Sequence, residues 1–237
     1  WFQKRLGFGI GLLQASHGLG PAIMAIVMGG LLTVVAWTTA FWGIALVGGG
    51  ILFVLLFLFR SRPADINVRP YGAPEDQPIE KKLDPAITAL RSKTYRKRMQ
   101  STSAFWKLVA VHHFGCVGHA IVIIYITPIA ISAGLDLVTA AGVLSTLAGV
   151  SVLTRFITPV MADFVGSKWC MAIMFILQGL PVLLLFFTHE VWHFYVWAVI
   201  FGIGYGGEGS AFPIINRQYF GRGPMGRSFG WQQFGAG

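Results

Sequence analysis

Charge is the first thing that this sequence lacks. Asp, Glu, Lys and Arg make up 11% of its 237 residues, whereas 55% of the chain is hydrophobic. Those proportions exclude an ordinary soluble domain and a disordered chain. Cysteine is also scarce, and Cys116 and Cys170 form neither a metal-ligand motif nor a disulfide framework. No nucleotide-binding loop occurs, so we do not expect the chain to use ATP, and we expect no cofactor.

Acidic residues are scarcer than basic ones: nine against 18, which gives a formal net charge of +9. A basic chain can bind nucleic acid, but these basic residues lie in short segments between apolar runs. That pattern is typical of the positive-inside rule of membrane proteins. We therefore expect a lipid bilayer as the partner of this chain, and no nucleic acid.

Long apolar runs are abundant. Each is long enough, at about 20 residues, to cross the hydrocarbon core of a bilayer as a helix. A β-barrel would show shorter segments of alternating hydrophobicity instead. The sequence thus predicts an all-α, polytopic membrane protein. Complete spans are expected at residues 7–34, 39–59, 105–133, 138–161, 168–188 and 192–214, and a further span is expected to begin near Gly226.

The basic loops alternate with loops that contain no Lys or Arg, near residues 35–38, 134–137 and 189–191. By the positive-inside rule the basic loops are cytoplasmic and the other loops face outward. The charged, Pro-rich segment 60–104 is then a cytoplasmic linker that includes a short helix near 84–99. It is expected to join the end of one helix bundle, residues 1–59, to a second bundle, residues 105–237.

One basic residue, Arg155, lies inside an apolar stretch, GVSVLTRFITPVM at residues 149–161. An unpaired cation at the centre of a spanning helix costs about 2.5 to 3.5 kcal/mol on insertion scales, so an anion should meet it. A guanidinium suits a carboxylate, because it donates two parallel hydrogen bonds and stays protonated. The carboxylate could belong to a substrate or to the protein, and Glu208 is the protein candidate.

Residues near Arg155 and Glu208 extend this prediction to half of a substrate site. A rise of about 1.5 Å per residue puts Arg155 about 12 Å from Asp163 and Glu208 about 13 Å from the next basic loop, so the two charges could share one level. Ser151 lies one turn from Arg155, and Tyr205 lies three residues from Glu208. Glu208 is the expected proton-coupling group, because its protonation should respond to the arrival of a substrate at Arg155.

Histidines mark two further candidate sites. His112, Cys116 and His119 fall at positions i, i+4 and i+7, on one helix face, which we expect to bind substrate, to exchange protons or to form interhelical hydrogen bonds. No metal site is expected, because a further clear ligand is lacking. His17 and Gln14 could contact substrate or join two helices.

The loop MADFVGSKW, residues 161–169, resembles the short cytoplasmic loop signature of the major facilitator superfamily. The match lies at Asp163, Gly166 and Lys168, which the resemblance assigns to a conformational loop motif. The superfamily is a twelve-helix transporter fold with two halves joined by a basic cytoplasmic loop. The sequence departs from the signature at Pro159, Phe164 and Ser167.

Three other stretches are similar to the monocarboxylate transporter and oxalate/formate antiporter branch of that superfamily. They are WFQKRLGFGIGLLQASHGLG at 1–20, RSRPADINVRPYGA at 60–73 and GYGGEGSAFPIINRQYFG at 204–221. The resemblance implies helices five to the start of eleven of a secondary transporter for small carboxylates. Transport would use alternating access, coupled to protons or to a counter-substrate, in a multi-pass protein of a bacterial inner membrane. In that branch an arginine of the eighth helix binds the substrate carboxylate, and Arg155 stands at the matching place.

Other functions compete with this one. An exporter of other organic or drug-like compounds would use Arg155 only structurally, and a sensor could use the same fold without transport. A membrane enzyme is not expected, because clustered His motifs are lacking and Ser210 has no convincing partner that would activate it as a nucleophile.

Overall fold

The computed structural model describes residues 1–31, 34–79, 84–221, 223–224 and 226–234. Within these ranges it describes every side chain except those of residues 6, 7, 21, 22, 25, 26, 28–30, 163 and 227. The described chain is helical apart from its loops and one isolated bridge between Phe2 and Tyr71, which confirms the all-α class. Its elements are α1 (Leu6–Leu31), α2 (Trp37–Leu58), η1 (Pro63–Ile66), α3 (Pro85–Gln100), α4 (Ser103–Ser132), α5 (Leu137–Val165), α6 (Ser167–Gly179), η2 (Leu180–Phe187), α7 (Val191–Phe220) and α8 (Gly226–Phe234).

Five of the described helical segments are long and apolar enough to cross a membrane. They are α2, α4, α5 as far as Ala162, α6 with η2, and α7, and they match five of the predicted spans. The remaining predicted span, 7–34, contains α1, and its residues 32–33 lie outside the described residues. The short helix predicted near 84–99 is α3, and α8 begins at Gly226 as expected.

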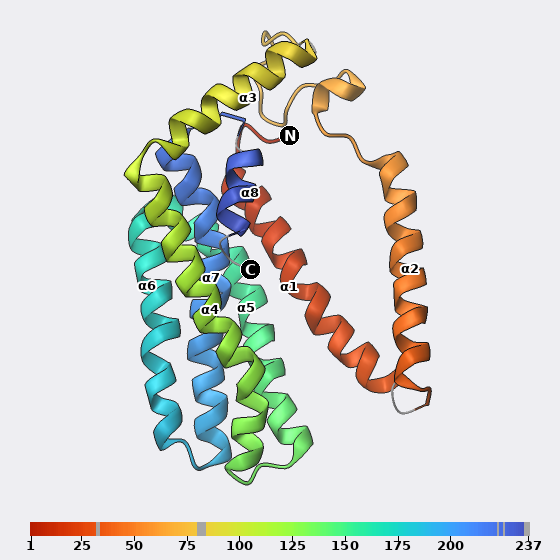
Figure 1. Ribbon diagram of the computed structural model, residues 1–237, viewed down its shortest axis with the longest axis vertical. Helices are drawn as coiled ribbons and strands as arrows, with labels where there is room; N and C mark the ends of the chain where they lie inside the picture. The colour runs from red at the N-terminus through yellow and green to blue at the C-terminus, as the bar shows by residue number, and fades with distance from the viewer. Residues whose placement is uncertain (32–33, 80–83, 222, 225, 235–237) are drawn as a thin grey trace. The chain divides into compact units, whose positions relative to one another are not determined.

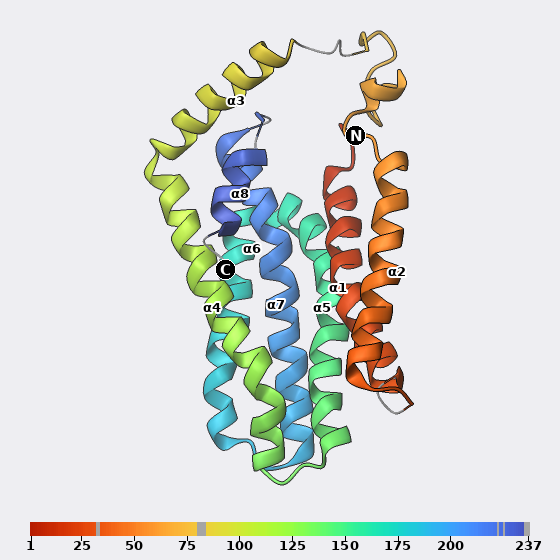
Figure 2. The ribbon, with the colours of Figure 1, turned by 45° about the vertical axis from the view of Figure 1, so that its right-hand side comes forward.

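The chain divides into two compact units. One contains Trp1–Leu6 and Gly20–Lys82, and there the backbone of Tyr71 bonds to that of Trp1 and Gln3. The other contains Gly7–Leu19 and Leu83–Gly237. Figures 1 and 2 show that α4, α5, α6 and α7 of this second unit run side by side as a helix bundle. The candidate site lies within this unit.

Helix α7 is the most deeply packed of the spans, and glycine allows that packing. A Cβ at Gly202 would lie 2.7 Å from the carbonyl oxygen of Leu147 on α5, and a Cβ at Gly204 would lie 2.7 Å from the carbonyl oxygen of Met174 on α6. Side chains at these positions would therefore push the helices apart. The close approach fixes α7 against both neighbours.

The connection between α5 and α6 depends on one glycine. Gly166 has φ +88°, a conformation that residues with a side chain rarely adopt, and its N–H bonds to the carbonyl of Ala162 at 3.0 Å. It ends α5 and begins α6 in a single residue. The Lys168 ammonium lies 5.8 Å from the ring centre of Trp169, whereas the side chain of Asp163 lies outside the described residues.

Candidate functional site

A cavity of about 450 Å³ lies inside the second unit. Its wall is built from α1, α4, α5, α7 and α8, and it gathers most of the polar side chains predicted from the sequence. The predicted residues on this wall are Gln14, His17, His112, His119, Arg155, Tyr205 and Glu208, and Cys116 and Gln233 join them.

Arg155 is buried, with 6% of its surface exposed. Its guanidinium carbon lies 5.0 Å from the ring centre of Tyr205, a cation–π contact. Its Nε atom is fully buried and has no hydrogen-bond partner in the part of the chain that the structure describes. Nor does any described carboxylate form an ion pair with it, so its charge is unmatched by the protein's described side chains.

Two glycines leave the space that the arginine occupies. A Cβ at Gly18 of α1 would lie 3.0 Å from Cδ of Arg155, and a Cβ at Gly209 of α7 would lie 3.1 Å from its Nη1. Either methyl group would press on the side chain, because such distances are shorter than ordinary van der Waals contact. The guanidinium thus lies in a slot that α1 and α7 form around it.

Two prolines explain the hydrogen bonds at this slot. Proline has no N–H, so Pro159 leaves the carbonyl of Arg155 without its helical partner, and Pro213 does the same to the carbonyl of Gly209. The Ser210 hydroxyl donates to the Arg155 carbonyl at 2.9 Å, and the Gln14 amide donates to the Gly209 carbonyl at 2.7 Å. These bonds join α5 to α7 and α1 to α7 at the level of the guanidinium.

Glu208 is buried more deeply, at 1% exposed, but its carboxylate has partners. Its Oε2 accepts a hydrogen bond of 2.8 Å from Nε2 of Gln178 on α6 and lies 3.1 Å from Nδ1 of His119 on α4. Its Oε1 has no hydrogen-bond partner among the described residues and lies 4.0 Å from Nδ1 of His112. The carboxylate is therefore held at one oxygen by two helices.

The pairing that the sequence left open, Glu208 with Arg155, is not the one that the structure forms. Residues adjacent along a helix point about 100° apart, and on α7 it is Gly209, together with Tyr205 one turn earlier, that faces the guanidinium. Glu208 points instead toward α4 and α6. The Tyr205 ring, which covers the guanidinium, also contacts the ring of His119, the partner of Glu208, with 4.9 Å between ring centres.

The structure places the other predicted residues as follows. Ser151 is buried, donates its hydroxyl to the carbonyl of Ala148 at 2.7 Å and packs against Gly206, so it belongs to the α5–α7 contact and does not appear on the cavity wall. His17 is exposed and borders the cavity from α1. Gln14 borders it too, but its amide already bonds to α7.

His112 and Cys116 also lie on the cavity wall, on α4. The His112 ring stacks on that of Phe212 at 4.1 Å between ring centres, which fixes its plane. The Cys116 Sγ lies 3.7 Å from Nε2 of His112. Gln178 and Gln233 were not predicted, because the sequence around a single amide in an apolar run does not indicate which side of the helix faces the site.

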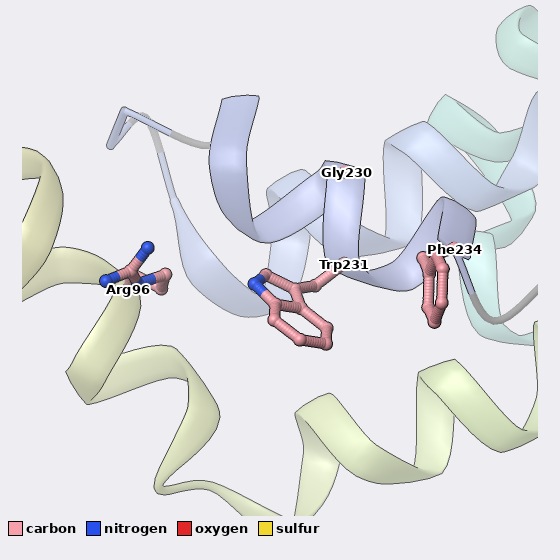
Figure 3. Close-up of a pocket in the computed structure, with 4 residues that line it drawn as sticks. All are labelled: Arg96, Gly230, Trp231 and Phe234. Atoms are coloured by element: carbon pink, nitrogen blue, oxygen red, sulfur yellow. The ribbon is translucent and has the colours of Figure 1, made fainter.

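A second, separate hollow of about 370 Å³ lies between α3 and α8. Figure 3 shows its lining side chains, with Arg96 on α3 and Trp231 and Phe234 on α8. Helix α3 is held nearby by Tyr95, whose hydroxyl donates to the carbonyl of Phe220 at 2.8 Å and whose pKa is raised by burial. Among the described lining residues, the two hollows share none.

A family model matches the entire chain, residues 1–237, and its description is Major Facilitator Superfamily. No curated protein sequence matches the chain.

Proposed function

Because this chain belongs to the major facilitator superfamily and is thus part of a multi-pass membrane transport protein, we propose that its substrate is a small carboxylate that binds to Arg155. The observation that carries the proposal is a buried guanidinium that no described protein carboxylate neutralises. Such a charge is expensive within a membrane unless an anion reaches it. The similarity to the monocarboxylate and oxalate/formate branch, seen in the sequence, supports the same substrate class.

The surroundings of Arg155 favour a planar anion of modest size. A cavity of about 450 Å³ accommodates a small organic acid. Tyr205 covers the guanidinium from one side, and the glycine slot holds its stem. Arg155 lines this cavity, and a guanidinium can bind a carboxylate through two parallel hydrogen bonds.

Transport would proceed by alternating access between the two halves of the superfamily fold, coupled to protons or to a counter-substrate. The proton-carrier role of Glu208 stays a prediction. Its suggested route, a competition between substrate and Glu208 for Arg155, has no direct contact to act through, since His119 and Gln178 hold the carboxylate.

The test is counterflow of labelled substrate by the full-length protein in proteoliposomes. Small monocarboxylates and dicarboxylates should compete with one another for uptake, whereas the amides of the same acids, equal in size but uncharged, should not. Equal competition by acid and amide would overturn the proposal and favour the alternative, an exporter of other organic compounds in which Arg155 is structural.

A further inference from the structure

Three possible metal ligands meet on the wall of the cavity that Arg155 also lines. His112 and Cys116 lie one turn apart on α4, and Glu208 reaches them from α7. One ligand atom from each residue lies within 4.8 Å of the other two. From these contacts we propose that His112, Cys116 and Glu208 bind a borderline-soft divalent cation of the Zn²⁺ class.

The distances suit such an ion after small side-chain movements. Nδ1 of His112 lies 4.0 Å from Oε1 of Glu208 and 3.8 Å from Sγ of Cys116. Bonds of about 2.0 Å to nitrogen and oxygen and about 2.3 Å to sulfur, at tetrahedral angles, would place these atoms about 3.5 Å apart. The two distances from Nδ1 of His112 therefore have to shorten by only a few tenths of an ångström to reach those of a metal site.

The free oxygen of Glu208 is the observation that points to a ligand. Glu208 is 1% exposed, and its Oε1 has no hydrogen-bond partner within the described chain although it faces His112. Leaving a buried carboxylate oxygen without a partner is costly. A cation between Oε1, Nδ1 and Sγ would supply that partner.

The neighbours of the three ligands match the outer shell of a metal site. Gln178 and His119 both contact Oε2 of Glu208, which turns Oε1 toward the cluster. Phe212 fixes the plane of the His112 ring by stacking. Hydrogen-bond partners such as Gln178 and His119 orient a ligand, and losing such a partner typically lowers metal affinity by about 10- to 100-fold.

The donor set selects the ion. An imidazole nitrogen, a thiolate and a carboxylate favour Zn²⁺ and similar metals over Mg²⁺ or Ca²⁺, which prefer oxygen alone. Binding requires the thiolate, so the Cys116 thiol releases its proton to water as the ion binds. Three protein ligands leave a fourth position, and it opens on the cavity because all three residues line it.

The sequence alone predicted no metal site here because it showed only the ligands of one helix. His112, Cys116 and His119 recur on one face of α4, but the additional ligand comes from a position 92 residues after Cys116. In the structure His119 contacts Glu208, which places it behind the carboxylate as a positioning residue.

An ion at this place would inhibit transport, because it fills part of the cavity that the substrate must enter. This consequence rests on the proposed function, whereas metal binding itself does not. Binding and transport are therefore measured separately.

The binding test uses Co²⁺ as a spectroscopic probe for Zn²⁺ in the purified full-length protein. Co²⁺ should produce a sulfur-to-metal charge-transfer band in the near ultraviolet, and Zn²⁺ should displace it while Mg²⁺ does not. Cys116→Ser should abolish the band, and Glu208→Gln and His112→Gln should each weaken Co²⁺ binding at least about tenfold. Cys170→Ser and His189→Gln are the matched controls and should bind Co²⁺ like the unmodified protein.

The proposal is overturned if no such band appears, or if Cys116→Ser keeps it. Zn²⁺ should also inhibit counterflow by the unmodified protein and by Cys170→Ser but not by Cys116→Ser. Inhibition of equal strength in Cys116→Ser would overturn the inhibitory role. A charge-transfer band that depends on Cys116 in a protein without carboxylate flux would support the metal site and contradict only the proposed function.

Discussion

Arg155 and Glu208 lie on two walls of one cavity, and the protein treats their charges in opposite ways. The guanidinium has an aromatic ring and two close-packed glycines around it but no described carboxylate, whereas the carboxylate has an amide and an imidazole on one oxygen. A buried charge that the protein leaves unmatched is available to a mobile ion of opposite sign. A buried charge that the protein already holds in place can bind a further ion only through an atom that has no partner. In Glu208 that atom is Oε1, which has no hydrogen-bond partner among the described residues.

Removing the fork of Arg155 should have the largest effect on transport. Arg155→Lys keeps the charge but loses the two parallel hydrogen bonds, which should cost about 1 to 3 kcal/mol of substrate binding, or roughly a 5- to 150-fold loss of affinity. The measurement is counterflow by the full-length protein, with Arg91→Lys on the exposed surface of α3 as the control. Normal counterflow by Arg155→Lys would show that the residue acts only as a charge or a structural partner.

Removing a partner of the Glu208 carboxylate should lower the stability of the protein more than it lowers substrate binding. His119→Ala leaves Oε2 of Glu208 with Gln178 alone, and the lost partner should lower the free energy of unfolding by about 1 to 3 kcal/mol. The thermal midpoint is measured with a chelator present, so that no metal ion replaces the imidazole. His189→Ala, at an exposed position, should leave the midpoint unchanged. His119→Gln should restore part of the loss, because glutamine can still donate.

The sequence predicted Arg155 and Glu208 as site residues but did not predict which side chains contact them. The helical class, five of the spans and the burial of Arg155 followed from apolar run lengths and from the cost of a buried cation. The direction of Glu208 around α7 did not, because a shared depth leaves the rotation of each helix undetermined. That rotation is set by contacts such as Gly202 against Leu147 and Gly204 against Met174, whose partners are distant in the sequence. The domain boundaries and the sidedness of the loops stay predictions.

A methyl group at Gly209 should lower substrate affinity through Arg155, but by less than the Arg155→Lys substitution does. Gly209→Ala places a carbon 3.1 Å from Nη1 of Arg155, so the guanidinium must shift by a few tenths of an ångström. We expect substrate affinity to fall about fivefold, equivalent to about 1 kcal/mol. Gly179→Ala is the matched control, since a Cβ at that position meets open space. Equal affinities of the two variants would contradict the slot around Arg155.

The smallest effect is expected at Asp136, an exposed charge at the start of the helix that carries Arg155. Its carboxylate accepts hydrogen bonds from the Thr139 hydroxyl and from the N–H groups of Thr139 and Val138, and these bonds lower its pKa. Because the pKa is lower in the folded chain than in the unfolded one, the stabilisation is present above the unfolded pKa and is lost as the pH falls through the folded one.

Asp136→Asn keeps a capping side chain but cannot titrate. The thermal midpoint of the variant should therefore fall less steeply than that of the unmodified protein as the pH is lowered from about 5 toward 3. Counterflow at neutral pH should be unchanged. A loss of transport in Asp136→Asn would show that an exposed charge on the same helix is as important for transport as the buried Arg155. The assignment of the substrate to Arg155, which depends on its being a buried charge, would then lose its support.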